Sequence, residues 1–133
     1  MYITPEEARA LMFRADPGRL RGDWPVGLRD SAVLALLAAG LSPAEISHLK
    51  ASAITMGRGN LLVRLKRRGV RHPFPLPVDL GARVLAWLSD RRLWATAARV
   101  FDSPWGPLTA NNVHQLLYRY RHPKPPKSRR PRP

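Results

Sequence analysis

Residues 28–40, LRDSAVLALLAAG, decide the fold. This stretch is apolar on nearly every face of a helix, which is typical of a helix surrounded by the rest of its domain. Gly40 follows as a residue that often ends a helix, because glycine adopts left-handed backbone angles without a steric penalty. The sequence therefore predicts a buried central helix over residues 28–40.

Capping signals predict further helices on both sides of this central one. Thr4 and Ser42 each precede a proline and lie three residues before a glutamate, the pattern of a capping box with proline at the first helical position. Thr109 precedes a segment with apolar residues at helical spacing, and residues 80–88 carry one apolar stripe of the same period. We expect a helix at each of these four places.

Between the helices, the apolar period changes from that of a helix to that of a strand. Apolar side chains alternate along residues 61–65 and along residues 72–76, and KRRG (residues 66–69) separates the two runs as a turn. Pro73 and Pro75 lack a backbone donor, which places the second strand at a sheet edge. The sequence thus predicts a mainly α fold with a small antiparallel β-hairpin or sheet, an α+β class.

Length and composition bound the domain organisation and the chemistry. The 133 residues favour one domain, residues 1–121, and a basic Pro-rich tail, residues 122–133, that has too few apolar side chains to fold. Cys is absent and the four His are scattered, so no metal or cofactor is expected. No apolar run approaches the roughly 20 residues of a membrane span, and a capped helix replaces a signal region at the start. A cytoplasmic location is expected, with no membrane partner.

The charge indicates a polyanionic partner. Lys and Arg number 23 against nine Asp and Glu, a net charge of +14, and double-stranded DNA is the favoured partner. Cations cluster in the hairpin, and amides and arginines share the outer face of the last helix, where they suit base edges in a major groove. The candidate nucleic-acid-binding residues are Lys50, Arg58, Arg64, Lys66, Arg67, Arg68, Arg71, Asn111, Asn112, Gln115, Arg119 and Arg121.

Three phrases and their order resemble a known family. They are GLSPAEI (residues 40–46), PLP at the end of the basic hairpin (residues 75–77) and GPLT before the last helix (residues 106–109). Together with the order of elements over about residues 4–121, they resemble the first part of the catalytic domain of tyrosine recombinases, the phage integrase family. The resemblance implies a truncated integrase-like fold and a link to DNA recombination and integration.

The sequence differs from that family at positions that the family needs for DNA cleavage. The family cleaves a phosphodiester with a tyrosine nucleophile, while two arginines, a lysine and a histidine or tryptophan hold the phosphate. Ser42 stands at the first arginine position, and Lys66 or Arg67 is nearest to the hairpin lysine. No His-x-x-Arg helix or terminal tyrosine segment follows residue 121. The resemblance therefore implies a non-catalytic DNA-binding protein with degenerate catalytic positions at Ser42, Lys66 and Arg67.

Two alternatives stay open from the sequence. A winged-helix regulator would use residues 40–49 as the first helix of a helix-turn-helix and the basic hairpin as its wing, although a strand-like segment, residues 53–65, follows where a recognition helix is expected. A small RNA-binding or assembly protein is the other, although aromatic-rich strand motifs of the RNA-recognition type are absent. The oligomeric state and the DNA site are left open.

Overall fold

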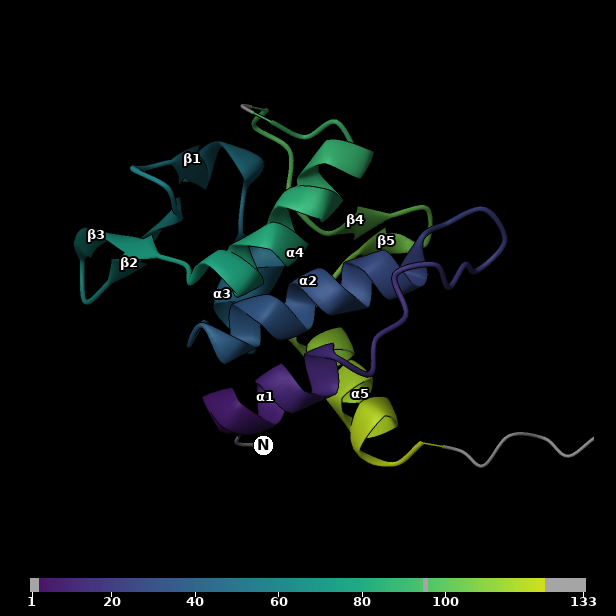
Figure 1. The fold of residues 1–133 in the computed structure, drawn as a ribbon. Helices are drawn as coiled ribbons and strands as arrows, with labels where there is room; N and C mark the ends of the chain where they lie inside the picture. Colours follow the sequence, from purple (N-terminus) through teal and green to yellow (C-terminus); the bar gives the residue numbers. More distant parts are fainter. Residues whose placement is uncertain (1–2, 95, 124–133) are drawn as a thin grey trace, which may run out of the picture.

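The computed structural model describes residues 3–94 and 96–123 of the chain. This part is mixed α+β, as expected, with five α-helices, a three-stranded antiparallel sheet and a two-stranded hairpin (Figure 1). The elements are α1 (Pro5–Met12), α2 (Val26–Ala38), α3 (Pro43–His48), the 3-10 helix η1 (Ala51–Ala53), β1 (Ile54–Met56), β2 (Leu61–Arg67), β3 (Val70–Pro75), α4 (Val78–Asp90), β4 (Asp102–Ser103), β5 (Gly106–Pro107) and α5 (Ala110–Arg121).

Helix α2 lies in the core, as predicted, although it begins two residues earlier than expected. Residues 32–38 are all buried, and the helix packs against α1 and α4 (Figure 1). Its end is a hydrogen-bonded cap in which Gly40 N donates to Leu37 O at 3.0 Å and Leu41 N donates to Leu36 O at 3.1 Å. The φ of Gly40 is 104°, so the predicted helix stop requires glycine at this position.

Side-chain caps hold the starts of three other helices. Thr4 Oγ1 accepts from Glu7 N at 3.1 Å at the start of α1. A full capping box opens α3, where Ser42 Oγ accepts from Glu45 N at 3.1 Å and Ser42 N donates to Glu45 Oε1 at 2.9 Å. Thr109 forms the same kind of box at the start of α5. The capping signals therefore predicted these helix starts correctly.

The sheet has the order β1-β2-β3, so β3 with its two prolines lies at an edge, as predicted. Strands β2 and β3 pair from Leu62 opposite Pro75 to Arg67 opposite Val70. The turn is narrower than the expected residues 66–69, because Lys66 and Arg67 are still paired in the strand. Arg68 and Gly69 alone form it, with φ of 51° and 76°, and positive φ at both central residues is typical of a tight hairpin turn.

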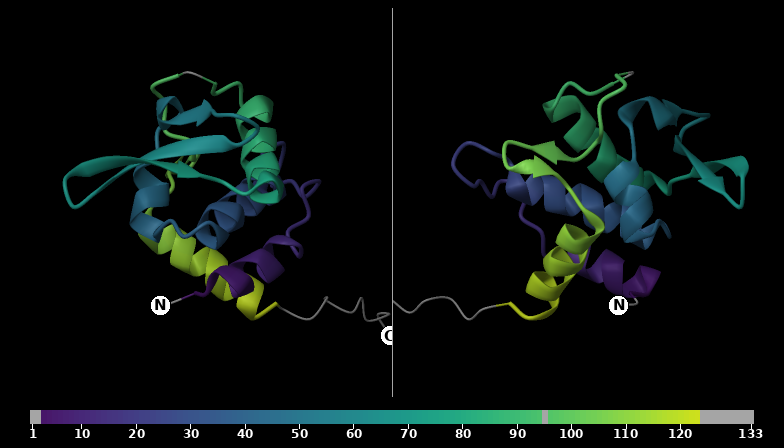
Figure 2. Two further views of the ribbon diagram at one scale, coloured as in Figure 1. Left: turned by 60° about the vertical axis from the view of Figure 1, so that its left-hand side comes forward. Right: turned by 180° about the vertical axis from the view of Figure 1, so that it is seen from behind.

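The second hairpin, β4–β5, leads into α5, which packs against α3. Tyr120 on α5 donates its hydroxyl proton to Asp30 Oδ2 on α2 at 2.9 Å, and Asp30 is only 1% exposed. In both views of Figure 2, the β2–β3 hairpin and the C-terminal half of α5 lie in different parts of the molecule. In the described ranges, no helix combines the length and the apolar character that crossing a bilayer requires. Most of the predicted basic tail, residues 124–133, lies outside the described residues.

Candidate nucleic-acid interface

One face of the β2–β3 hairpin gathers cations. Lys66 and Arg71 are directly opposite each other in the strand pairing, and Arg64 lies two residues before Lys66 on the same face. Lys50, which follows α3, completes a set that lines one pocket of about 560 Å³. We call Lys50, Arg64, Lys66 and Arg71 the basic sheet face. His48 and Ser52 line the same pocket.

The electrostatics of the basic sheet face favour an anionic ligand. Like charges directly opposite each other on paired strands are destabilising, and Lys66 and Arg71 form such a pair. Among the residues that the structure describes, no carboxylate lies within ion-pair distance of these four side chains. The cations therefore keep an uncompensated positive charge that a phosphate group can neutralise.

Glu45 also lines this pocket, but its charge is already paired. Arg67 Nε donates to Glu45 Oε2 and Arg67 Nη2 to Glu45 Oε1, each at 2.9 Å. Arg67 Nη2 also donates to Gly40 O at 3.1 Å. These hydrogen bonds, with the Ser42 contacts, hold the pKa of Glu45 below its ordinary value. Arg67 projects from the opposite face of β2 and ties the strand to the start of α3.

The three residues that were expected to be degenerate catalytic positions do not all line one pocket. Ser42 and Arg67 line one pocket together with Glu45, whereas Lys66 lines the pocket of the basic sheet face. The Ser42 hydroxyl is held in the capping box, and the Arg67 guanidinium is held by Glu45 and the Gly40 carbonyl. Ser42 therefore acts as a helix cap, and Arg67 forms a structural ion pair with Glu45.

Arg58 and Arg68 are exposed at the two loops that flank β2. Arg58 lies in the loop between β1 and β2, and Arg68 occupies the hairpin turn. Neither lines the pocket of the basic sheet face.

The candidate residues on α5 differ in whether their side chains are exposed or already bonded within the protein. Asn111, Gln115 and Arg119 are exposed on the outer face of the helix, as predicted. Asn112 uses its Oδ1 to accept from Thr109 N at 3.0 Å in the capping box. Arg121 forms an ion pair with Glu7 of α1. The outer face of α5 is thus available for a ligand, while Arg121 joins two helices.

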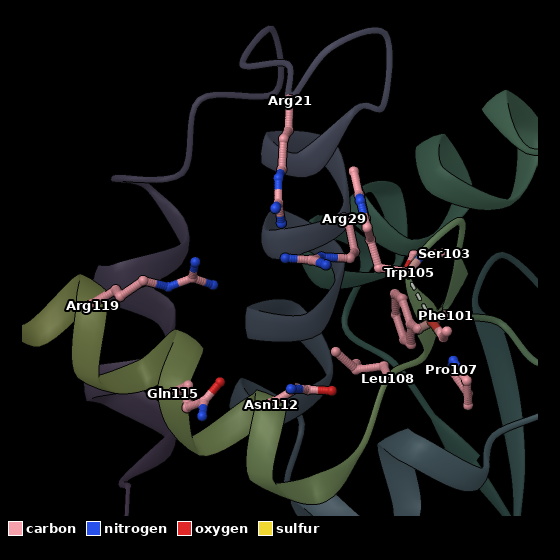
Figure 3. Close-up of a pocket in the computed structure, with 11 residues that line it drawn as sticks. Arg21, Arg29, Phe101, Ser103, Trp105, Pro107, Leu108, Asn112, Gln115 and Arg119 are labelled. Carbon is pink, nitrogen blue, oxygen red and sulfur yellow. Dashed lines mark hydrogen bonds between the residues drawn. The ribbon is translucent and has the colours of Figure 1, made fainter.

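The structure does not bring the outer face of α5 onto the basic sheet face. Asn112, Gln115 and Arg119 instead line a pocket with Arg21 and Arg29, and this pocket shares no lining residue with that of the basic sheet face (Figure 3). Arg29 lies near the start of α2 and Gly40 just after its end, a separation of about 16 Å along a helix. There are therefore two basic surfaces, one near each end of α2.

Arg21 and Arg29 were not identified from the sequence as candidate binding residues, because they are far from Arg119 along the chain. Arg21 lies in the connector between α1 and α2, and Arg29 lies in the first turn of α2. The signal that points to Arg29 is the charged pair Arg29–Asp30 at the start of an otherwise apolar helix. A buried charge needs a partner, and such a pair marks a specific polar contact inside the fold.

No protein-family model and no curated protein sequence matches this chain. Among residues 3–94 and 96–123, no group of three or more His, Asp and Glu side chains is placed to hold a metal ion.

Proposed function

We propose that this chain is a non-catalytic DNA-binding protein, derived from the catalytic domain of a tyrosine recombinase, that contacts the duplex through its basic sheet face. One observation carries the proposal: four cations line one pocket, and none has a carboxylate partner within the described part of the chain. The DNA backbone presents closely spaced phosphates, and cations that neutralise them release condensed counterions.

The rigidity of the hairpin supports this assignment. Arg64, Lys66 and Arg71 project from strands that are paired along their whole length. Because the backbone is already ordered, binding does not have to fix it at a cost of about 1–2 kcal/mol per residue. The hairpin also projects from the helical body (Figures 1 and 2), and a two-stranded ribbon is narrow enough to enter a major groove.

The degenerate site supports a non-catalytic protein. Ser42 caps α3, so a neutral hydroxyl stands where the recombinase resemblance implies a guanidinium. Tyr118 packs against the ring of His122, with ring centroids 4.6 Å apart. Burial and the Asp30 carboxylate raise the pKa of Tyr120 well above its ordinary value, which disfavours the phenolate that a nucleophile needs.

Of the two alternatives, the winged-helix regulator receives less support. After α3 the chain forms η1 and then β1, whereas a winged-helix regulator places a recognition helix there. A phosphate-binding face by itself does not distinguish DNA from RNA. Binding to RNA must therefore be compared with binding to duplex DNA by experiment.

Fluorescence anisotropy with a short labelled DNA duplex tests the proposal. For about four phosphate contacts, the affinity should fall about 100-fold between about 50 and about 200 mM salt, because the salt slope follows the number of phosphates neutralised. Unlabelled duplex RNA and single-stranded DNA serve as competitors. Absence of binding at the lower salt would contradict DNA binding, and stronger competition by RNA would favour the RNA alternative.

A suicide DNA substrate that traps covalent intermediates tests the non-catalytic part. We expect no protein–DNA adduct on denaturing gels. An adduct that disappears in Tyr118→Phe or in Tyr120→Phe would show that the chain retains a nucleophile and would overturn this part of the proposal.

A further inference from the structure

A second basic pocket lies at the other end of α2 from the hairpin. Three guanidinium groups point into it, from Arg21 in the α1–α2 connector, Arg29 in α2 and Arg119 in α5 (Figure 3). The cavity has a volume of about 210 Å³. We call it the arginine pocket.

Local contacts hold two of these arginines in place. Arg29 donates to Asp30 Oδ1 from Nε at 3.2 Å and from Nη2 at 2.9 Å, and its side chain is only 14% exposed. The Arg21 guanidinium lies 4.2 Å from the centroid of the Trp105 ring. These contacts pre-position the cations before any ligand binds.

The connector that carries Arg21 is itself fixed against α2. Arg21 exchanges two backbone hydrogen bonds with Trp24, at 2.9 and 3.0 Å. Gly27 N donates to Arg19 O at 3.0 Å, and a Cβ on Gly27 would lie 1.7 Å from the carbonyl oxygen of Asp16. A glycine is therefore required where the connector crosses the start of α2, and this close approach sets the position of Arg21 over the pocket.

Arg21 and Arg119 bring positive charge to the pocket that no lining carboxylate neutralises, whereas Arg29 is paired with Asp30. No carboxylate is among its lining residues. Asp30, which pairs with Arg29, faces Tyr120 on the other side and does not line the pocket. Asn112 commits its Oδ1 to the capping box, which leaves the Nδ2 donors for a ligand. The guanidinium groups of Arg21 and Arg119, the remaining Nη1 of Arg29 and the amide donors beside them match the oxygens of a phosphate group.

Most of the remaining lining residues are apolar, and apolar surface favours a nucleotide over a bare anion. Phe101, Pro107 and Leu108 also line the pocket, and the ring of Trp105 lies against the Arg21 guanidinium (Figure 3). A nucleotide combines an anionic phosphate with flat apolar rings, so it matches both walls. The volume is below the range of about 300–1,000 Å³ typical of drug-sized ligands, which limits the pocket to one nucleotide.

We infer that the arginine pocket binds the phosphate group of a single nucleotide, either free or at the end of a nucleic-acid strand. The inference does not depend on duplex binding by the basic sheet face, because the two pockets share no residue.

Calorimetric titration of the full chain with AMP, adenosine and inorganic phosphate tests it. AMP should bind more tightly than either of the others, because adenosine lacks the anion and phosphate lacks the rings. The double variant Arg21→Gln and Arg119→Gln should weaken AMP binding about tenfold or more, through loss of two charge-assisted contacts. Both residues are exposed, and circular dichroism checks that the variant folds.

Two control variants locate the binding. Arg92→Gln removes one charge from an exposed turn after α4 that lines neither pocket, and it should leave AMP affinity unchanged. Lys66→Gln with Arg71→Gln should weaken duplex binding and leave AMP binding intact, so the two proposals fail separately. Equal loss of AMP affinity in the hairpin variant and in the arginine-pocket variant would overturn the inference.

A strand-end experiment distinguishes the source of the phosphate. If AMP does not bind, a single strand with a 5′-phosphate is compared with the same strand carrying a 5′-hydroxyl. A preference for the phosphorylated strand that is lost in the Arg21→Gln and Arg119→Gln variant supports a strand end as the ligand. Absence of both AMP binding and this preference overturns the inference.

Discussion

The two faces of the β2–β3 hairpin use the same kind of side chain for different purposes. Lys66 and Arg67 are adjacent in the chain, yet successive residues of a strand point to opposite faces. Lys66 joins Arg64 and Arg71 on a face without carboxylate partners in the described residues, whereas Arg67 is held by Glu45 and the Gly40 carbonyl. A single cluster of cations thus divides into side chains without a carboxylate partner in the described residues and one side chain that is held in an ion pair.

The largest expected effect comes from the outer face. Replacing Arg64, Lys66 and Arg71 together by Gln should weaken duplex binding about 100-fold at low salt and reduce the salt slope by about 3. The side chains are exposed, so the thermal transition should stay close to that of the unmodified chain. Anisotropy titrations at several salt concentrations measure both quantities.

Arg92→Gln is the control, since it removes a charge from an exposed turn that lines neither pocket. Normal duplex binding by the triple variant would show that the hairpin is not the docking surface. The binding would then have to be sought at the arginine pocket or in residues 124–133.

The second-largest expected effect is a loss of stability when Ser42 is replaced. Ser42→Ala removes the side-chain cap of α3 and should lower the free energy of unfolding by about 1 kcal/mol. Duplex affinity should change little, because Ser42 does not line the pocket of the basic sheet face. Urea unfolding measures the first quantity. A large loss of affinity in a folded Ser42→Ala variant would mean that Ser42 contacts the ligand.

A double-mutant cycle on Arg67 and Glu45 sharpens the assignment of Arg67 to structure. Each single change to Gln should lower the free energy of unfolding by about 0.5–1 kcal/mol, since the pair is only partly buried. The double change should cost less than the sum, because it leaves no unpaired charge. Additive losses would show that the two side chains are not coupled.

The smallest expected effect is the pH dependence of this same pair. The Arg67 hydrogen bonds lower the pKa of Glu45 below its ordinary value of 4.5, so the folded state binds this proton more weakly than the unfolded state. The stabilisation is present above pH 4.5 and is lost as the pH falls through the lowered pKa. The stability difference between the unmodified chain and Glu45→Gln should therefore shrink in acid, as measured by urea unfolding across that range.

Local signals in the sequence were sufficient for most of the elements. The capping residues Thr4, Ser42 and Thr109 marked helix starts because their side chains satisfy backbone donors only a few residues away. The prolines of β3 marked an edge strand because they lack a donor for a further strand. The expected turn at residues 66–69 was too wide, because composition alone does not show where strand pairing stops.

The sequence by itself determined the α+β class, the buried central helix and the concentration of positive charge in the hairpin, because each depends on periodicity or composition over a short window. Only the tertiary structure decided which cations are free to bind. Glu45 lies 22 residues before Arg67 and yet removes it from the candidate surface. Arg21 and Arg29 meet Arg119 only because α2 and α5 pack together through Asp30 and Tyr120. Such contacts join distant parts of the chain, and no local pattern records them.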